Sequence, residues 1–231
     1  IYLTGNPQIT FFKVVYRRHT NFAMESIEQT FNGTADYGKK VTCTVSRNGD
    51  LVSRVYLEVD LAAYATATPG ANVGHRLIKN VEVEVGGQRV DKQYGEWLEV
   101  WADLTLSGAQ KAGYTTMCGA ATQAAKRIYV PLQFWFCRNP GLALPLIALQ
   151  YHEVKINMEF NPISSVSSTT TECTGGAFNS ASLWVDYVYL DTDERRRFAQ
   201  VSHEYLIEQV QFTGAESVSS TSNKLRLNFN H

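Results

Sequence analysis

Residues 54–61 have the sequence Arg-Val-Tyr-Leu-Glu-Val-Asp-Leu, with an apolar residue at every second position. Successive side chains of a β-strand point to opposite faces of its sheet, so this alternation is typical of a strand with one face in the core and the other in solvent. The same period of two recurs at residues 81–85 and 154–160. We therefore predict three half-buried strands and an all-β protein.

Short turn sequences separate the strand patterns. Gly86-Gly87 lies between two of them and predicts a two-residue hairpin, while Asn32-Gly33 and Asn48-Gly49 are typical of tight turns with positive φ. Such turns favour antiparallel pairing. Weaker strand patterns occupy residues 9–15, 23–31, 40–46, 127–136, 183–191, 205–212 and 225–229.

One segment follows a helical period instead. Between residues 94 and 105, Trp97, Leu98, Trp101 and Leu104 recur at spacings of three and four, which predicts an amphipathic helix with its two tryptophans in the core. A shorter helix is expected at residues 193–199, with Thr192 as its cap. Loops are expected where Gly, Ala, Ser and Thr dominate, at residues 62–74, 107–125, 162–182 and 214–223.

Composition narrows the class of protein. The chain has 231 residues, enough for a substantial buried core, and 12% of them are aromatic, which favours strands. With 21 basic and 22 acidic side chains, its formal net charge of -1 creates no field that would attract nucleic acid, so no direct nucleic-acid partner is expected. The longest apolar run, residues 142–149, contains Pro145 and is far shorter than the roughly 20 residues of a membrane-spanning helix.

Motifs for catalysis or metal binding are incomplete. His152-Glu153 and His203-Glu204 resemble the start of the zinc motif H-E-x-x-H, but Ile156 and Ile207 stand where the second histidine would be needed. The sequence has no H-x-H pair of the cupin type, no G-x-S-x-G and no complete phosphate-binding G-x-x-x-x-G-K-S/T, because Lys40 follows Lys39 where Ser or Thr would be needed. We therefore expect no enzyme, no cofactor and no metal site. Scattered cysteines, expected to be reduced thiols, are Cys43, Cys118, Cys137 and Cys173.

Two features of the sequence are compatible with carbohydrate binding or attachment. Tryptophans can stack against sugars, so a carbohydrate-binding jelly-roll module is an alternative function. Asn32-Gly33-Thr34 is the only N-x-S/T sequon, which makes Asn32 a possible glycosylation site, although the same residues are expected to form a turn. The chain contains four tryptophans, Trp97, Trp101, Trp135 and Trp184.

Longer sequence segments, referred to here as phrases, recur in a fixed order over almost the whole chain and carry a resemblance to one family. A central one, residues 140–154, is PGLALPLIALQYHEV, and the chain opens with LTGNPQITFFK at residues 3–13. The other phrases are residues 16–22, 46–51, 85–91, 184–187, 203–209 and 225–231. In this order they resemble the double jelly-roll major capsid proteins of nucleocytoplasmic large DNA viruses, of the algal and giant virus type.

The resemblance implies a domain organisation. Residues 1–212 would form the first roll, an antiparallel eight-stranded jelly-roll sandwich with short helical insertions. Residues 213–223 would be an interdomain linker, and residues 224–231 the opening strand of a truncated second roll. The chain is thus expected to be the N-terminal portion of a longer protein.

The resemblance also implies a structural function. The full protein is expected to form homotrimers that act as pseudo-hexagonal capsomers of an icosahedral capsid, in contact with neighbouring capsomers and minor capsid proteins. A segment before Ile1 would reach toward an inner viral membrane. Such a protein is expected in the virion, after assembly in the host cell cytoplasm, and the family has no catalytic residues to transfer.

Overall fold

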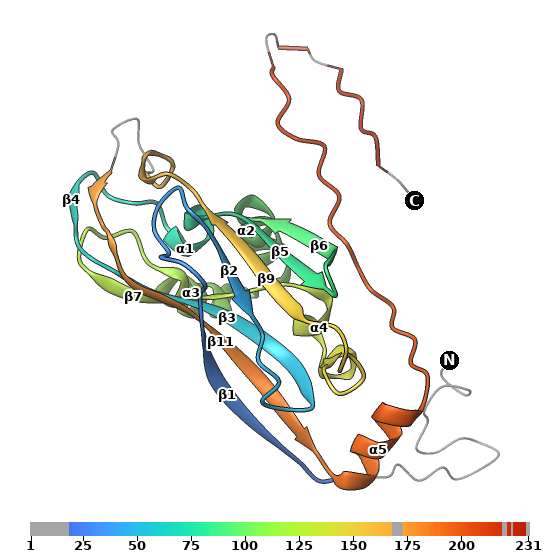
Figure 1. The fold of residues 1–231 in the computed structure, drawn as a ribbon. Helices are drawn as coiled ribbons and strands as arrows, with labels where there is room; N and C mark the ends of the chain where they lie inside the picture. Colours follow the sequence, from blue (N-terminus) through green and yellow to red (C-terminus); the bar gives the residue numbers. More distant parts are fainter. Residues whose placement is uncertain (1–18, 168–172, 219–220, 223, 230–231) are drawn as a thin grey trace.

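The computed structural model describes residues 19–167, 173–218, 221–222 and 224–229. Two antiparallel sheets form a sandwich (Figure 1). The first sheet has the order β1-β11-β3-β7, and β8 also pairs with β3; the second has the order β2-β9-β5-β6. The first sheet contains β1 (Phe22–Thr30), β3 (Leu51–Leu61), β7 (Lys126–Pro131), β8 (Leu144–Pro145) and β11 (Phe178–Leu190). The second contains β2 (Lys40–Thr44), β5 (Ile78–Val85), β6 (Gln88–Tyr94) and β9 (Val154–Phe160).

The path of the chain defines the topology. It passes between the sheets from β1 to β2, β3 and β5, turns into β6, and returns through β7, β9 and β11. Eight antiparallel strands divided between two sheets in this way form a jelly roll. The predicted fold class is therefore confirmed. A small extra pair, β4 (Tyr64–Thr66) with β10 (Thr174–Gly175), lies within two of the predicted loops.

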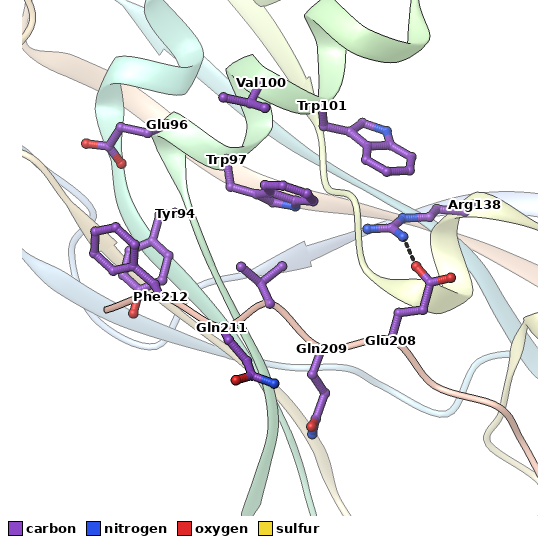
Figure 2. Close-up of a pocket in the computed structure, with 11 residues that line it drawn as sticks. Tyr94, Glu96, Trp97, Val100, Trp101, Arg138, Glu208, Gln209, Gln211 and Phe212 are labelled. Carbon is purple, nitrogen blue, oxygen red and sulfur yellow. Dashed lines mark hydrogen bonds and ion pairs between the residues drawn. The ribbon is translucent and has the colours of Figure 1, made fainter. Parts of the chain in front are cut away.

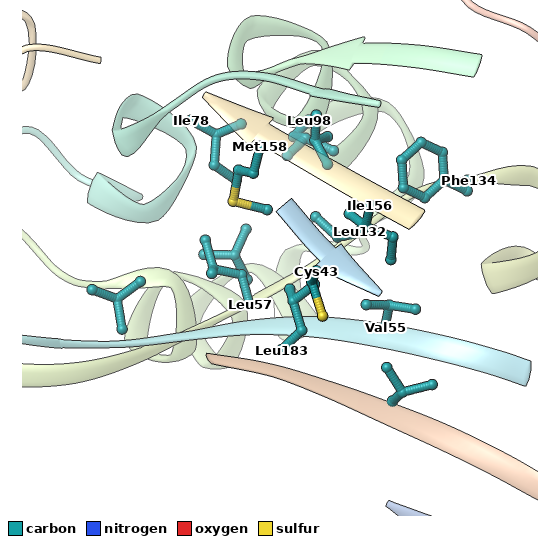
Figure 3. Packing of buried hydrophobic residues seen from close by; sticks show 14 of the residues in the cluster. Cys43, Val55, Leu57, Ile78, Leu98, Leu132, Phe134, Ile156, Met158 and Leu183 are labelled. Carbon is teal, nitrogen blue, oxygen red and sulfur yellow. The ribbon is translucent and has the colours of Figure 1, made fainter. Parts of the chain in front are cut away.

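The alternating strands form the core. Leu57 and Leu183 from the first sheet, and Ile156 and Met158 from the second, are completely buried between the sheets (Figure 3). Removing such a side chain from water contributes roughly 1.5–3 kcal/mol. The predictions of half-buried strands at residues 54–61, 81–85 and 154–160 are confirmed.

The turns fulfil the prediction only in part. Val85 pairs with Gln88 across Gly86 and Gly87, whose φ angles are 59° and 85°, as expected for the two-residue hairpin. Gly49 does not have positive φ, contrary to the prediction. Its backbone instead passes close to Tyr187, since an added Cβ would lie 2.7 Å from the Cβ of that residue.

The helices correct several expectations. The long helix is present as α2 (Gly95–Thr105), and the shorter one as α5 (Thr192–Gln200), capped by Asp191 and not by Thr192. The predicted loop 107–125 contains α3 (Gly108–Cys118), whose many small residues obscured its period. The predicted strand 127–136 ends at Pro131 and is followed by α4 (Trp135–Arg138). Shorter elements are α1 (Val73–Leu77) and two 3-10 turns, η1 (Pro140–Leu142) and η2 (Ile163–Ser165).

The chain after α5 has no helix or strand in its described residues and runs along and then away from the sandwich (Figure 1). The strands expected at 205–212 and 225–229 are therefore wrong for this structure, because neither segment forms a backbone ladder with a sheet edge. The expected strand at 9–15 and the opening phrase at 3–13 lie outside the described residues.

Among the helices that the structure describes, none has the length and apolar character needed to cross a membrane.

Candidate functional site

A groove of about 670 Å³ lies between α2 and the chain that follows α5 (Figure 2). We refer to residues 208–212, which form one wall of this groove, as the C-terminal strap. The opposite wall comes from α2, from the end of β6 and from Arg138 at the end of α4. The lining residues are mainly aromatic or aliphatic: Tyr94, Trp97, Val100, Trp101, Val210 and Phe212, with Glu96, Arg138, Glu208, Gln209 and Gln211 among them.

Helix α2 has two apolar faces, which explains how the groove arises. Leu98 and Ala102, four residues apart, are buried against the sandwich. Trp97 and Trp101, also four residues apart, are only half-buried and line the groove, with ring centroids 6.0 Å apart. The prediction that both tryptophans belong to the core is therefore wrong, because smaller residues on the same helix fill that position.

Arg138 joins the two walls. Its guanidinium carbon lies 4.0 Å from the centre of the Trp101 ring, a cation–π arrangement, and its Nη1 pairs with the carboxylate of Glu208 in the strap. Glu208 is largely exposed, whereas Arg138 is mostly covered. The pair therefore closes one end of the groove, and the aromatic ring holds the cation in place.

Asp91 anchors the middle of the strap. Its side chain is 3% exposed, and its Oδ1 accepts the backbone N–H of Lys92 at 2.9 Å and that of Val210 at 3.0 Å. The other oxygen accepts Nε2 of Gln93 at 3.0 Å. A buried carboxylate needs such donors, because an unpartnered one would be strongly disfavoured. The strap is thus attached to β6 through a side chain and not through a strand ladder.

Further contacts flank this anchor. Gln209 donates from Nε2 to the carbonyl of Val90, and the ring of Phe212 lies 4.5 Å from that of Tyr94, centroid to centroid. Glu208, Gln209, Val210 and Phe212 of the strap therefore each contact β6 or α4. This arrangement fixes the direction in which the chain leaves the jelly roll.

A second polar cluster joins three helices. His75 on α1 is 2% exposed; its Nδ1 contacts Glu99 on α2, and its Nε2 lies 2.9 Å from the hydroxyl of Tyr114 on α3. Asn72 donates to both oxygens of Glu99, at 2.9 and 3.1 Å. Burial lowers the pKa of His75, although Glu99 opposes this shift, and burial raises the pKa of the Cys118 thiol to about 12. The cluster therefore ties the helices together through a neutral imidazole.

Sequence patterns gave no indication of this cluster. The three helices that supply it include α1 and α3, which begin in or lie within predicted loops, and His75 and Tyr114, which contact each other, are 39 positions apart. The other histidines in the described ranges lie elsewhere: His19 and His152 are exposed, and Nε2 of His203 contacts the carbonyl of Phe198. Across the described ranges, no three His, Cys, Asp or Glu side chains come together as metal ligands would.

The other residues singled out in the sequence analysis lie apart from one another and from the groove. Trp135 is buried in the core and Trp184 is half-buried on β11, so the structure does not bring these two to the groove tryptophans. Asn32 lies on the surface beside Gly33, which has a φ of 101°, and its backbone N–H donates to the carbonyl of Thr42 at 2.7 Å. The four cysteines are unpaired, and all except Cys137 are buried.

Comparison with known proteins identifies the family. Residues 10–191 match the family described as major capsid protein N-terminus. The chain belongs to this major capsid protein family. It is 61% identical to the major capsid protein of Pyramimonas orientalis virus, over the whole chain and 59% of that protein, and 48% identical to that of Paramecium bursaria Chlorella virus 1, over 55% of its length.

Solved capsid structures have the same fold. The PBCV-1 virus capsid protein matches with a TM-score of 0.80 and 43% identity, over 96% of this chain and 56% of that one. The Faustovirus major capsid protein, at 13% identity and a TM-score of 0.61, supports the fold alone. The chain spans little more than half the length of these major capsid proteins, and the family predicted from its phrases is confirmed.

Proposed function

We propose that this chain is the first jelly-roll domain of a major capsid protein that builds the shell of a large DNA virus. The observation that carries the proposal is the match to the PBCV-1 virus capsid protein, which extends over 96% of the chain at 43% identity. The proposed role is structural and not enzymatic. A stiff two-sheet sandwich with a fully packed core suits a subunit that must repeat many times without deforming.

Assembly follows from the same proposal. The first roll ends near residue 212, residues 213–223 link it to a second roll, and residues 224–231 begin that roll. Full-length subunits form homotrimers, which serve as pseudo-hexagonal capsomers that contact neighbouring capsomers and minor capsid proteins. The capsomers assemble in the host cytoplasm, and a segment before Ile1 reaches toward an inner membrane. A formal charge of -1 on this chain keeps repulsion between closely packed copies small.

Quantitative mass spectrometry of purified virus particles tests the role. Peptides of this chain should be among the most abundant in the intact particle. They should be absent from particles whose shell has been removed, and present in the removed shell fraction. A protein present at only a few copies per particle, or one that stays with the genome, would contradict a shell function.

Asn32 is proposed as a glycosylation site on the capsid surface. Its side chain lies on an exposed bend, and Thr34 completes the sequon. Intact-mass and peptide analysis of protein from virions should show a glycan at Asn32 that is lost in the Asn32→Gln variant. Unmodified Asn32 in all peptides would refute this proposal without affecting the structural role.

A further inference from the structure

Helix α3 covers one edge of the buried imidazole of His75. The ring belongs to α1, and its Nε2 lies 2.9 Å from the hydroxyl of Tyr114 on α3, while its Nδ1 contacts the carboxylate of Glu99 on α2. An ionised carboxylate can only accept hydrogen bonds, so Nδ1 carries the ring proton and Nε2 accepts the O–H of Tyr114. The neutral imidazole therefore links α2 to α3.

Apart from this link, α3 is weakly attached to the rest of the domain. Cys118 is the one residue of α3 that is buried, whereas α1 and α2 bury four and three residues respectively. Lys111 forms an exposed ion pair with Asp103 at 2.8 Å, and Sγ of Cys118 donates weakly to the carbonyl of Tyr129 at 3.5 Å. Elements that bury little apolar area open locally at a lower free-energy cost than the whole domain. Of the three helices around His75, α3 is therefore the one that opens at the lowest cost.

We propose that α3 is a lid that opens locally when His75 takes up a proton. A protonated imidazole donates from both nitrogens, so Nε2 no longer accepts the O–H of Tyr114. The hydroxyl must then turn toward Cys118, which it also contacts and whose sulfur is a weak acceptor. The new charge lies on a residue that is only 2% exposed. Opening α3 returns Nε2 to water, and solvation favours the charged imidazole.

The other ionisable groups near His75 do not cancel this effect. Glu99 and Asp103 on α2 favour the charged imidazole, but burial outweighs them and keeps the pKa of His75 below its usual 6.5. On α3, Tyr114 and Cys118 stay neutral because burial raises the pKa of each. The turn η2, which also packs against α1, has no charged residue. Charged side chains on α1 itself and on the neighbouring strands β5 and β7 bind other groups: Arg76 with the carbonyl of Ser167, Lys79 with Glu159, Glu82 with Lys92, Glu84 with Asn157, Lys126 with the carbonyl of Ala120, and Arg127 with Asp60.

Thiol labelling of the full-length protein tests the proposal. Cys118, at the end of α3, is completely buried, so it reacts only when the lid or the whole domain opens. Cys43 in β2 is equally buried between the sheets and reports unfolding of the domain. Dithiodipyridine, which reacts with thiols even in mild acid, is added at several pH values between 8 and 5. Peptide mass spectrometry then measures the rate at each cysteine, divided by the rate of the same cysteine in the urea-denatured chain.

The expected result has two parts. Cys118 should react faster than Cys43 at every pH, because opening α3 alone costs less free energy than unfolding the domain. The rate at Cys118 should also rise several-fold between pH 8 and pH 5, by at most about tenfold for each pH unit below 6.5.

Three variants assign the effect to the proposed groups. His75→Gln has no group that titrates at this position, so the acceleration of Cys118 labelling in acid should be lost. Tyr114→Phe lacks the hydroxyl that closes the lid, so Cys118 should react faster than in the parent already at pH 8. The matched control is Thr116→Ala, which removes another hydroxyl of α3 whose hydrogen bond, 3.0 Å to the carbonyl of Ala112, stays within the helix. Its labelling should equal that of the parent.

Each contrary outcome overturns the proposal. Equal rates at Cys118 and Cys43 would show that Cys118 is exposed only when the whole domain unfolds, and a Cys118 rate that does not change with pH would show that protonation leaves the lid closed. Acid acceleration that persists in His75→Gln would assign it to another group, and Tyr114→Phe labelling like Thr116→Ala would show that the hydroxyl does not hold α3. The comparison of the two cysteines needs only the parent protein, so it decides the proposal even where His75→Gln does not fold.

Discussion

The backbone N–H of Val210 donates a hydrogen bond to Oδ1 of Asp91 at 3.0 Å, joining two residues 119 positions apart in the chain. Asp91 lies in β6 of the second sheet, whereas Val210 lies in the strap that follows α5. The contact joins the β5-β6 hairpin of the second sheet to the segment through which the chain leaves the roll. In a two-domain capsid subunit, this coupling would help to orient one domain relative to the next.

Replacing Asp91 should therefore weaken the folded protein. In Asp91→Ala, the backbone N–H of Val210 and the side chain of Gln93 lose their acceptor, and we expect a loss of about 1–3 kcal/mol in the free energy of unfolding. Denaturant titration followed by tryptophan fluorescence measures the change. Glu153→Ala, which alters an exposed carboxylate, is the control and should shift the free energy by less than about 0.5 kcal/mol. Equal stability of both variants would contradict the anchoring role.

Two glycines should respond in opposite ways to the same substitution. An added Cβ at Gly95, the first residue of α2, would lie 2.1 Å from the carbonyl oxygen of His75 and 2.4 Å from that of Ile78, and neither backbone atom can easily move away. We expect Gly95→Ala to lose more than about 3 kcal/mol in the free energy of unfolding, at the severe end for single substitutions. Thermal melting monitored by circular dichroism measures this.

The matched control is Gly113→Ala, in the middle of α3. An added Cβ there meets no atom within 4 Å, and alanine has the higher helix propensity, so the variant should gain about 0.5–1 kcal/mol. A Gly95→Ala protein that melts with the parent, or a Gly113→Ala protein that fails to fold, would contradict the helix packing described here.

The core between the two sheets should be sensitive to lost volume. Leu57→Ala removes a completely buried side chain of β3, and we expect a loss of about 2–5 kcal/mol in the free energy of unfolding. Tyr151→Ala, which truncates a side chain that is 90% exposed, should change it by no more than about 0.5 kcal/mol. Chemical denaturation of both variants decides the point, and similar losses would indicate that β3 does not face the core.

Stability should fall at mildly acidic pH because of His75. Burial lowers its pKa below 6.5, so the unfolded chain binds a proton more readily than the folded one, despite the nearby carboxylates of Glu99 and Asp103 and the hydroxyl of Tyr114. The stability that this group contributes is complete above about pH 6.5 and is lost as pH falls from there toward the folded-state pKa. Each unit of difference between the two pKa values is worth about 1.4 kcal/mol.

Unfolding free energies measured from pH 8 to pH 5 test this on the protein and on His75→Gln. The variant should be less stable at neutral pH, yet its stability should change less between pH 7 and pH 5. Gly113→Ala supplies the control, since it changes no ionisable group and should keep the pH dependence of the parent. An unchanged slope in His75→Gln would contradict the neutral buried imidazole.

Sequence patterns predicted the parts of the fold in which burial is one-sided. Strand β3 and strand β9 each have one face in the core, so their alternation shows directly in the residues. The resemblance to the capsid family then identified the jelly-roll topology, because the alternation of apolar residues predicts strands but does not specify how they are connected. Helix α3 was missed because it buries only Cys118 and therefore has no apolar stripe.

The groove could not be predicted from the sequence for a different reason. The apolar residues of α2 predicted its helical period, but they could not show that Leu98 and Ala102 fill the core while the tryptophans face the strap. The strap has an alternating sequence that predicts a strand, yet its partner is the side chain of Asp91, far away in the chain. Contacts of this kind depend on the tertiary fold and carry no local signal.

The central claim is that this jelly roll is one half of a capsid building block, and the oligomeric state of the full-length protein tests it most directly. Size-exclusion chromatography with light scattering, followed by cryo-electron microscopy of the same peak, should give a stable trimer with two jelly rolls in each subunit and a pseudo-hexagonal outline. A full-length protein that remains a monomer at high concentration, or that forms particles lacking these rolls, would contradict it.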